Sequence, residues 1–165
     1  MELLIKNARV VDSSQDSIFD VYINKGIIYE IGKDLKKDCE VLDGEGYVLS
    51  PSFIDLHSHF REPGYTYKED LLSGSRAAVR GGYTAINLMA NTKPVCSSMD
   101  VIDKVLEKAS EIDLVDIHQC ASITEDLLGK SIDHLYQLTP KVRFISDDGK
   151  GVSNRDRKST RLNSS

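Results

Sequence analysis

The feature that most constrains the fold is an alternation of strand-like and helix-like segments that begins near residue 51. Short apolar runs typical of buried strands alternate with longer segments whose apolar residues recur every three or four positions. The strand-like runs lie within 50–60, 83–88, 114–119 and 142–146. This pattern predicts an α/β fold in which parallel strands are joined by right-handed helical crossovers.

The helices between these strands carry recognisable signals. Thr66 and Glu69 have the spacing of a capping box, so we expect a helix that starts there and ends at about Arg80, before two glycines. Segment 98–112 has one apolar stripe and predicts a second helix. One or two short helices are expected within 124–138.

The ends of the chain differ from this middle part. Residues 1–49 read as short strands separated by turns, and we expect a small β-sandwich module without chemistry of its own. Residues 50–154 form the α/β domain. Residues 155–165 are basic, serine-rich and almost free of apolar residues, so we expect a disordered, non-native tail there.

Composition excludes several classes of protein. The net charge is −5 and no basic stripe is present, which argues against a nucleic-acid partner. No apolar run reaches the roughly 18 residues of a membrane span, and residues 1–11 lack the layout of a signal peptide. Cys39, Cys96 and Cys120 have no close spacing and are typical of free thiols in a reducing compartment. We therefore expect a cytoplasmic protein.

A histidine pair ends the first predicted strand. His57 and His59 are two residues apart, so in a strand their imidazoles would lie on one face. Imidazole is a common ligand of Zn²⁺, and Arg61 adds a cation suited to a carboxylate or phosphate. Such a pair is a weak motif by itself, but the buried strand before it and the Pro63-Gly64 turn after it strengthen the interpretation as a metal site.

Further polar residues follow the other strands. Asn91 comes after the second strand, and Asp147 and Asp148 come after the fourth. In parallel α/β folds the carboxyl ends of the strands meet at one edge, where the chemistry takes place. We therefore expect these residues to join the histidines at one site.

Four motifs resemble the amidohydrolase superfamily and, within it, the bacterial dihydroorotases that use several metal ions. They are 53–64 (FIDLHSHFREPG), 81–84 (GGYT), 90–95 (ANTKPV) and 146–149 (SDDG). The resemblance covers residues 1 to about 154 and departs from the family at Ser52 and Ala90, neither of which is a functional position. It implies a zinc-dependent hydrolase of cyclic amides that interconverts N-carbamoyl-L-aspartate and dihydroorotate in pyrimidine biosynthesis.

The resemblance also implies roles for individual residues. His57 and His59 would bind the first of two zinc ions, and Asp148 would bridge both. His59, Arg61 and Asn91 would contact dihydroorotate. A carboxylate shared by two cations is consistent with activation of a water molecule at neutral pH. The family's catalytic aspartate has no counterpart in this sequence, so no general acid or base is assigned.

Other polar residues have structural alternatives. We expect Asp147 to be a structural acid beside the bridging Asp148, and Asn91 to contact substrate rather than to cap its own turn. Asp55 either orients a ligand or makes a buried hydrogen bond, with equal weight. Glu62 either supports the site or is solvated.

Other functions remain as alternatives. Lys141 lies at the start of the fourth strand, whereas several relatives carry a modified, metal-bridging lysine at its end. This favours a dihydroorotase over a hydantoinase or dihydropyrimidinase, and Arg61 argues against an allantoinase. A non-catalytic scaffold for aspartate transcarbamoylase is disfavoured because His57, His59 and Asp148 are all present.

The resemblance further implies the N-terminal part of a (β/α)8 TIM barrel. A complete barrel needs eight strand–helix units and about 250 residues, and the sequence predicts about four units. We therefore expect a truncated barrel, inactive alone, that lacks the second set of histidines. The complete enzyme would bind a small-molecule substrate and form a homodimer or associate with aspartate transcarbamoylase.

Overall fold

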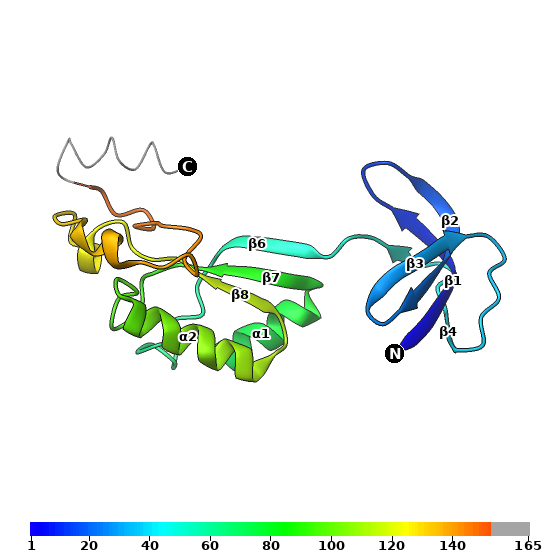
Figure 1. The fold of residues 1–165 in the computed structure, drawn as a ribbon, viewed down its shortest axis with the longest axis horizontal. Helices are drawn as coiled ribbons and strands as arrows, with labels where there is room; N and C mark the ends of the chain where they lie inside the picture. Colours follow the sequence, from blue (N-terminus) through cyan, green and yellow to red (C-terminus); the bar gives the residue numbers. More distant parts are fainter. Residues whose placement is uncertain (153–165) are drawn as a thin grey trace. The chain divides into compact units, whose positions relative to one another are not determined.

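The computed structural model describes residues 1–152, which divide into a first unit, Met1–Pro51, and a second unit that begins at Ser52 (Figure 1). The tail expected at 155–165 lies outside the described residues. Each unit has its own buried apolar cluster.

The first unit is one five-stranded sheet. Its strands are β1 (Glu2–Val11), β2 (Asp16–Asn24), β3 (Ile27–Gly32), β4 (Glu40–Asp43) and β5 (Val48–Leu49). The order is β3-β2-β1-β4, and β5 also pairs with β1. β1, β2 and β3 are antiparallel neighbours, whereas β4 and β5 run parallel to β1. The short, exposed β4 carries no alternating pattern and was not predicted.

The expected sandwich is a single layer among the described residues. Ile5, Ala8, Val10 and Val21 form the buried cluster of this sheet. β4 and β5 both pair directly with β1 at successive places along it. The β-rich module that was expected is therefore present, and its strands within residues 1–51 form one sheet.

The second unit is a parallel sheet with helices on one face. Its strands are β6 (Phe53–Ser58), β7 (Tyr83–Leu88) and β8 (Asp116–Gln119), in the order β6-β7-β8. Figure 1 shows α1 (Leu71–Arg80) and α2 (Met99–Ile112) side by side along this sheet, each in contact with it. Two short 3₁₀ helices, η1 (Glu125–Leu127) and η2 (Asp133–Gln137), follow β8. The strand–helix alternation of a TIM barrel is present as predicted.

The apolar stripe of α2 is the core of this unit. Ile102, Val105 and Ala109 are buried on α2, and the first two share a cluster with Ile86 and Leu88 of β7. Residues three and four apart on a helix lie on one face, which explains why this spacing covers the sheet. No helix in the described part of the chain is long and apolar enough to cross a membrane.

The start of α1 was predicted too early. The helix begins at Leu71, because the Asp70 carboxylate accepts a hydrogen bond from the Ser73 backbone N–H (2.7 Å) and completes a capping box. Glu69 is engaged elsewhere, since its carboxylate accepts from the Ser73 hydroxyl. The end of the helix at Gly81 agrees with the prediction.

The predicted fourth strand, 142–146, is only an isolated parallel bridge between Ala121 and Ile145. The ladder stops there because the next backbone amides, of Ile123 and Thr124, donate to the Asp147 carboxylate instead. The described part of the second unit therefore has three paired strands and one bridge, rather than four strands.

Candidate metal centre

His57 and His59 lie at the carboxyl end of β6. His57 is within the strand, and His59 follows directly after its last residue. Their ring centroids are 5.1 Å apart. The Asp55 carboxylate accepts a hydrogen bond from the His57 backbone N–H (2.9 Å), and the Ser58 carbonyl accepts from the N–H of Met89 (2.9 Å), just after β7. These bonds hold the strand end and present both imidazoles at the edge of the sheet.

Asp148 lies at the same edge because its buried neighbour, Asp147, anchors the backbone there. Asp147 is fully buried, and its carboxylate accepts from the backbone N–H groups of Ile123 and Thr124 (2.8 and 3.0 Å) and from the Thr124 hydroxyl (2.8 Å). Asp148 has a φ of 46°, in the left-handed region, and its N–H donates to the Ser146 hydroxyl. The backbone therefore directs one carboxylate inward and the next toward the histidines.

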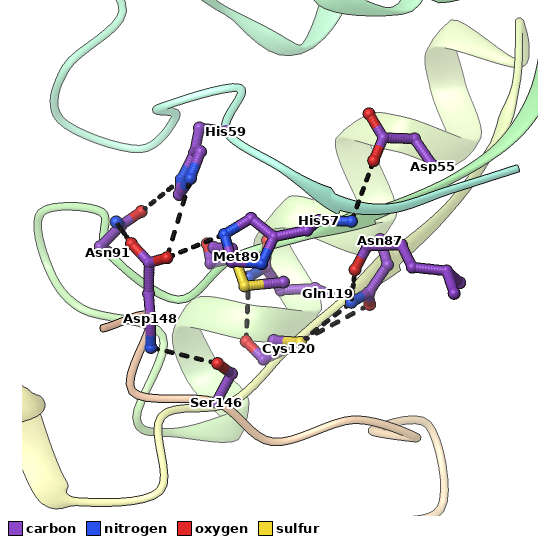
Figure 2. Close-up of polar contacts among 11 residues, drawn as sticks. Asp55, His57, His59, Asn87, Met89, Asn91, Gln119, Cys120, Ser146 and Asp148 are labelled. Carbon is purple, nitrogen blue, oxygen red and sulfur yellow. Dashed lines mark hydrogen bonds and ion pairs between the residues drawn. The ribbon is translucent and has the colours of Figure 1, made fainter. Parts of the chain in front are cut away.

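The three side chains His57, His59 and Asp148 converge (Figure 2). His57 Nε2 donates to Asp148 Oδ1 (2.8 Å), and His59 Nε2 lies 3.9 Å from the same oxygen. One potential ligand atom from each residue lies within 4.8 Å of the others. The site is open, because the exposed fractions of the side chains are 56% for His57, 27% for His59 and 23% for Asp148.

Asn91, which follows β7, links two members of this group. Its amide oxygen lies 3.0 Å from His59 Nδ1, and its Nδ2 donates to Asp148 Oδ2. Since the amide oxygen can only accept, His59 carries its proton on Nδ1. The Nε2 lone pair is then free on the side that faces Asp148, and an imidazole oriented through its other nitrogen is typical of metal ligands.

The donor set fits a zinc ion. Two neutral imidazoles and one carboxylate are among the ligands that Zn²⁺ prefers, and a catalytic zinc commonly keeps an open position. The ring of His59 already has the required tautomer. The hydrogen bond from His57 to Asp148 would be replaced when both bind the ion. Among the described residues, this is the only group of three or more potential ligands.

The other predicted residues have different surroundings. The side chain of Arg61 makes no hydrogen bond or ion pair within residues 1–152, and its backbone φ is 58°. The Asp55 carboxylate accepts from the backbone N–H of His57 rather than from a histidine ring. Glu62, for which support and solvation were both open, contacts the Leu71 N–H and the Lys108 ammonium. The structure thus brings His57, His59, Asn91 and Asp148 together, and the Arg61 guanidinium has no partner among residues 1–152.

Comparison with a model of a protein family shows the class to which this chain belongs. Residues 48–154 match the model of the amidohydrolase family, which is more than half of the chain. The chain therefore belongs to the amidohydrolase family.

Within this family, similar curated proteins include dihydroorotases. The dihydroorotase of Clostridium botulinum (strain Eklund 17B / Type B) is 57% identical over 93% of this chain and 39% of its own length. That of Sulfurihydrogenibium sp. (strain YO3AOP1) is 41% identical over 91% of this chain and 37% of its own length. These relatives agree with the family recognised from the four motifs. The chain spans about two fifths of the length of the relatives it matches.

Solved structures support the same fold. The dihydropyrimidinase of Brevibacillus agri NCHU1002 is 30% identical, with a TM-score of 0.65 over 82% of this chain and 29% of that one. L-Hydantoinase from Arthrobacter aurescens has a TM-score of 0.68 over 76% of this chain and 29% of its own, at 23% identity, and shows likeness of fold alone.

Proposed function

We propose that this sequence is part of a zinc-dependent dihydroorotase, which interconverts N-carbamoyl-L-aspartate and (S)-dihydroorotate in pyrimidine (UMP) biosynthesis. The observation that carries the proposal is the convergence of His57, His59 and Asp148 at the strand ends of a chain 57% identical to a dihydroorotase. The hydantoinase structures share the fold at lower identity, and support membership of the wider family rather than their own substrate.

In this proposal His57, His59 and Asp148 hold zinc, and Asp148 bridges two ions. The two oxygens of Asp148 already face different partners, His57 on one side and Asn91 on the other. Bound zinc would polarise the ring amide carbonyl and activate the attacking water. Asn91 accepts a hydrogen bond from Nδ1 of His59, so Nε2 is the nitrogen of the neutral ring that would bind the metal.

The substrate carboxylate is assigned to Arg61, with His59 and Asn91 as further contacts. The Arg61 guanidinium has no partner within residues 1–152, so its donors remain available to a ligand. A guanidinium binds a carboxylate through two parallel hydrogen bonds, which orients the ring as well as holding it. This would place the amide bond against the metal site.

The proposal extends to location and assembly. The three cysteines are free thiols, as expected of a cytoplasmic protein. We propose that the complete enzyme forms a homodimer or associates with aspartate transcarbamoylase, which size-exclusion chromatography with and without that partner distinguishes.

The test uses the complete protein that contains this sequence. We expect two zinc ions per chain by elemental analysis, turnover of dihydroorotate, and none of hydantoin or allantoin. The 165-residue chain alone should be inactive. Turnover of hydantoin without turnover of dihydroorotate would overturn the proposal, as would full activity of a zinc-free protein.

A further inference from the structure

We infer that Glu62 is a positioning residue for substrate binding: it ties the loop that carries Arg61 to α1 and α2, and so sets the direction of the Arg61 guanidinium. The inference rests on the proposed function, in which Arg61 binds the substrate carboxylate. It assigns a role to a side chain that touches neither metal nor substrate in that proposal.

Arg61 needs external support. Its φ of 58° lies in the left-handed region, which is strained for an L-residue and persists only where the surroundings impose it. Its carbonyl accepts a hydrogen bond from the Tyr65 N–H (3.0 Å), but its guanidinium has no partner in the described part of the chain. The direction of the guanidinium therefore depends on the backbone of this loop.

Glu62 supplies two tethers next to Arg61. Its Oε2 accepts from the backbone N–H of Leu71 (2.9 Å), the first residue of α1, and its Oε1 accepts from the Lys108 ammonium of α2. The Glu62 side chain is only 13% exposed, whereas that of Lys108 is 48% exposed. A largely buried carboxylate is costly unless it is paired, so both bonds favour a single position for the loop.

Capping of α1 accounts for only part of this arrangement. The helix has its own cap, because Asp70 accepts from the Ser73 N–H and completes the capping box. Glu62 satisfies a second free N–H, that of Leu71, from outside the helix. This bond stabilises the helix start and also fixes the loop of Arg61 to it.

The same loop is in backbone contact with the loop of Asn91. The Lys93 N–H donates to the Pro63 carbonyl (2.9 Å). A Cβ at Gly64, where φ is 91°, would lie 2.1 Å from the Lys93 carbonyl oxygen, so only glycine allows this approach. The Lys93–Pro63 bond therefore joins the loops of Arg61 and Asn91, and the tethers of Glu62 act on the first of these two loops.

The experiment compares Glu62→Ala with the unaltered complete enzyme. We expect KM for dihydroorotate to rise about tenfold, while kcat and zinc content change less than about twofold, because the substrate clamp and not the metal is displaced. Glu62→Gln, which keeps an acceptor for the Leu71 N–H, should restore part of the affinity. Lys108→Met should give a smaller rise, since one tether remains.

Two matched variants separate positioning from stability. Asp70→Ala removes the cap of the same helix and should lower Tm without changing KM. Lys141→Met removes the pair between Lys141 and Asp103 of α2 (2.7 Å) and should leave KM unchanged. An unchanged KM in Glu62→Ala would overturn the inference, and so would an equal rise in Asp70→Ala.

A readout independent of turnover keeps this inference separate from the proposed function. Trypsin cleaves after arginine, so release of the loop in Glu62→Ala should speed cleavage after Arg61 in the folded protein, as followed by mass spectrometry. Because residue 62 is part of the cleavage sequence, each rate is divided by that of a short peptide with the same sequence around Arg61. Cleavage at the rate of the unaltered protein would overturn the tether. An unaltered enzyme that does not turn over dihydroorotate, but shows this faster cleavage in the variant, would refute the proposed function alone.

Discussion

The two units use their carboxylates in different ways. In the sheet of the first unit, Asp20 is 3% exposed, and its oxygens accept from the backbone N–H groups of Asn7 and Leu35 (both 2.9 Å). The Lys6 ammonium lies 3.7 Å away. Every one of these partners belongs to the first unit, and each contact joins segments distant in the chain. Asp20 is therefore a structural acid.

Asp148 in the second unit has the opposite surroundings. Its carboxylate faces the side chains of His57, His59 and Asn91, and it is partly exposed. Side-chain partners at an open edge can exchange for an ion without disturbing the backbone, whereas bonds to buried amides cannot. Its neighbour Asp147, bonded to two amides and a hydroxyl, resembles Asp20. The kind of partner, rather than proximity to the site, separates a structural carboxylate from a candidate ligand.

The largest expected effect is at Asp148. In the complete enzyme, Asp148→Asn should reduce zinc content and lower kcat/KM by more than about 100-fold, the upper end for residues that only support a metal ligand. The unfolding midpoint of the metal-free protein should hardly change, because no backbone amide loses its partner. Elemental analysis, steady-state kinetics and thermal unfolding measure these three quantities. A variant with full zinc content and turnover would remove Asp148 from the proposed site.

Asp147→Ala should have the next largest effect, on stability. Its removal leaves the N–H groups of Ile123 and Thr124 without their acceptor in a buried place, at a cost of about 1–3 kcal/mol for each group. We expect a clearly lower Tm in thermal unfolding. Asp147→Asn, which keeps one acceptor oxygen, should lose less. Equal losses in both variants would contradict this account.

Much of the second unit could be predicted from local pattern. β7 matches its predicted range, and the apolar spacing of α2 identified the buried face, because burial on a regular element follows its period. The start of α1 could not be predicted, since Thr66 and Asp70 are both acceptable caps and the choice depends on where Glu69 and Ser73 meet. The missing fourth strand depends on a long-range bond to Asp147, which no local pattern reveals.

The candidate site shows the same division. Convergence of His57, His59, Asn91 and Asp148 followed from a rule about the ends of parallel strands. The contacts of Asn91 with His59 and Asp148 did not, because an asparagine after a strand is equally suited to a turn. The tethers of Glu62 were also not foreseen. One reaches Lys108, far along the chain, and the other reaches the start of α1, which local pattern placed too early.

The pH dependence at Asp20 is expected to be a moderate effect. Desolvation raises the pKa of this carboxyl. The hydrogen bonds from Asn7 and Leu35 and the nearby Lys6 lower it by more than desolvation raises it, so the net shift of the pKa is downward. Its stabilisation should therefore be complete above the unfolded pKa of about 4 and be lost as pH falls through the lower folded value. The difference in Tm between the unaltered protein and Asp20→Asn should be largest near pH 7 and shrink in acid. A difference independent of pH would contradict the role of the charge.

The smallest expected effect is a difference in reactivity between the thiols of the two units. Burial raises the pKa of Cys96 to about 11 and also raises that of Cys120, and both are at most 1% exposed. Cys39 in the first unit is only half-buried. Because the thiolate is the reactive form, brief treatment with iodoacetamide should modify Cys39 first, as mapped by mass spectrometry. In denaturant all three should react alike. Rapid labelling of Cys96 in the folded protein would show that the second unit opens readily. Its core would then be too weak to hold the strand ends that carry the candidate metal ligands.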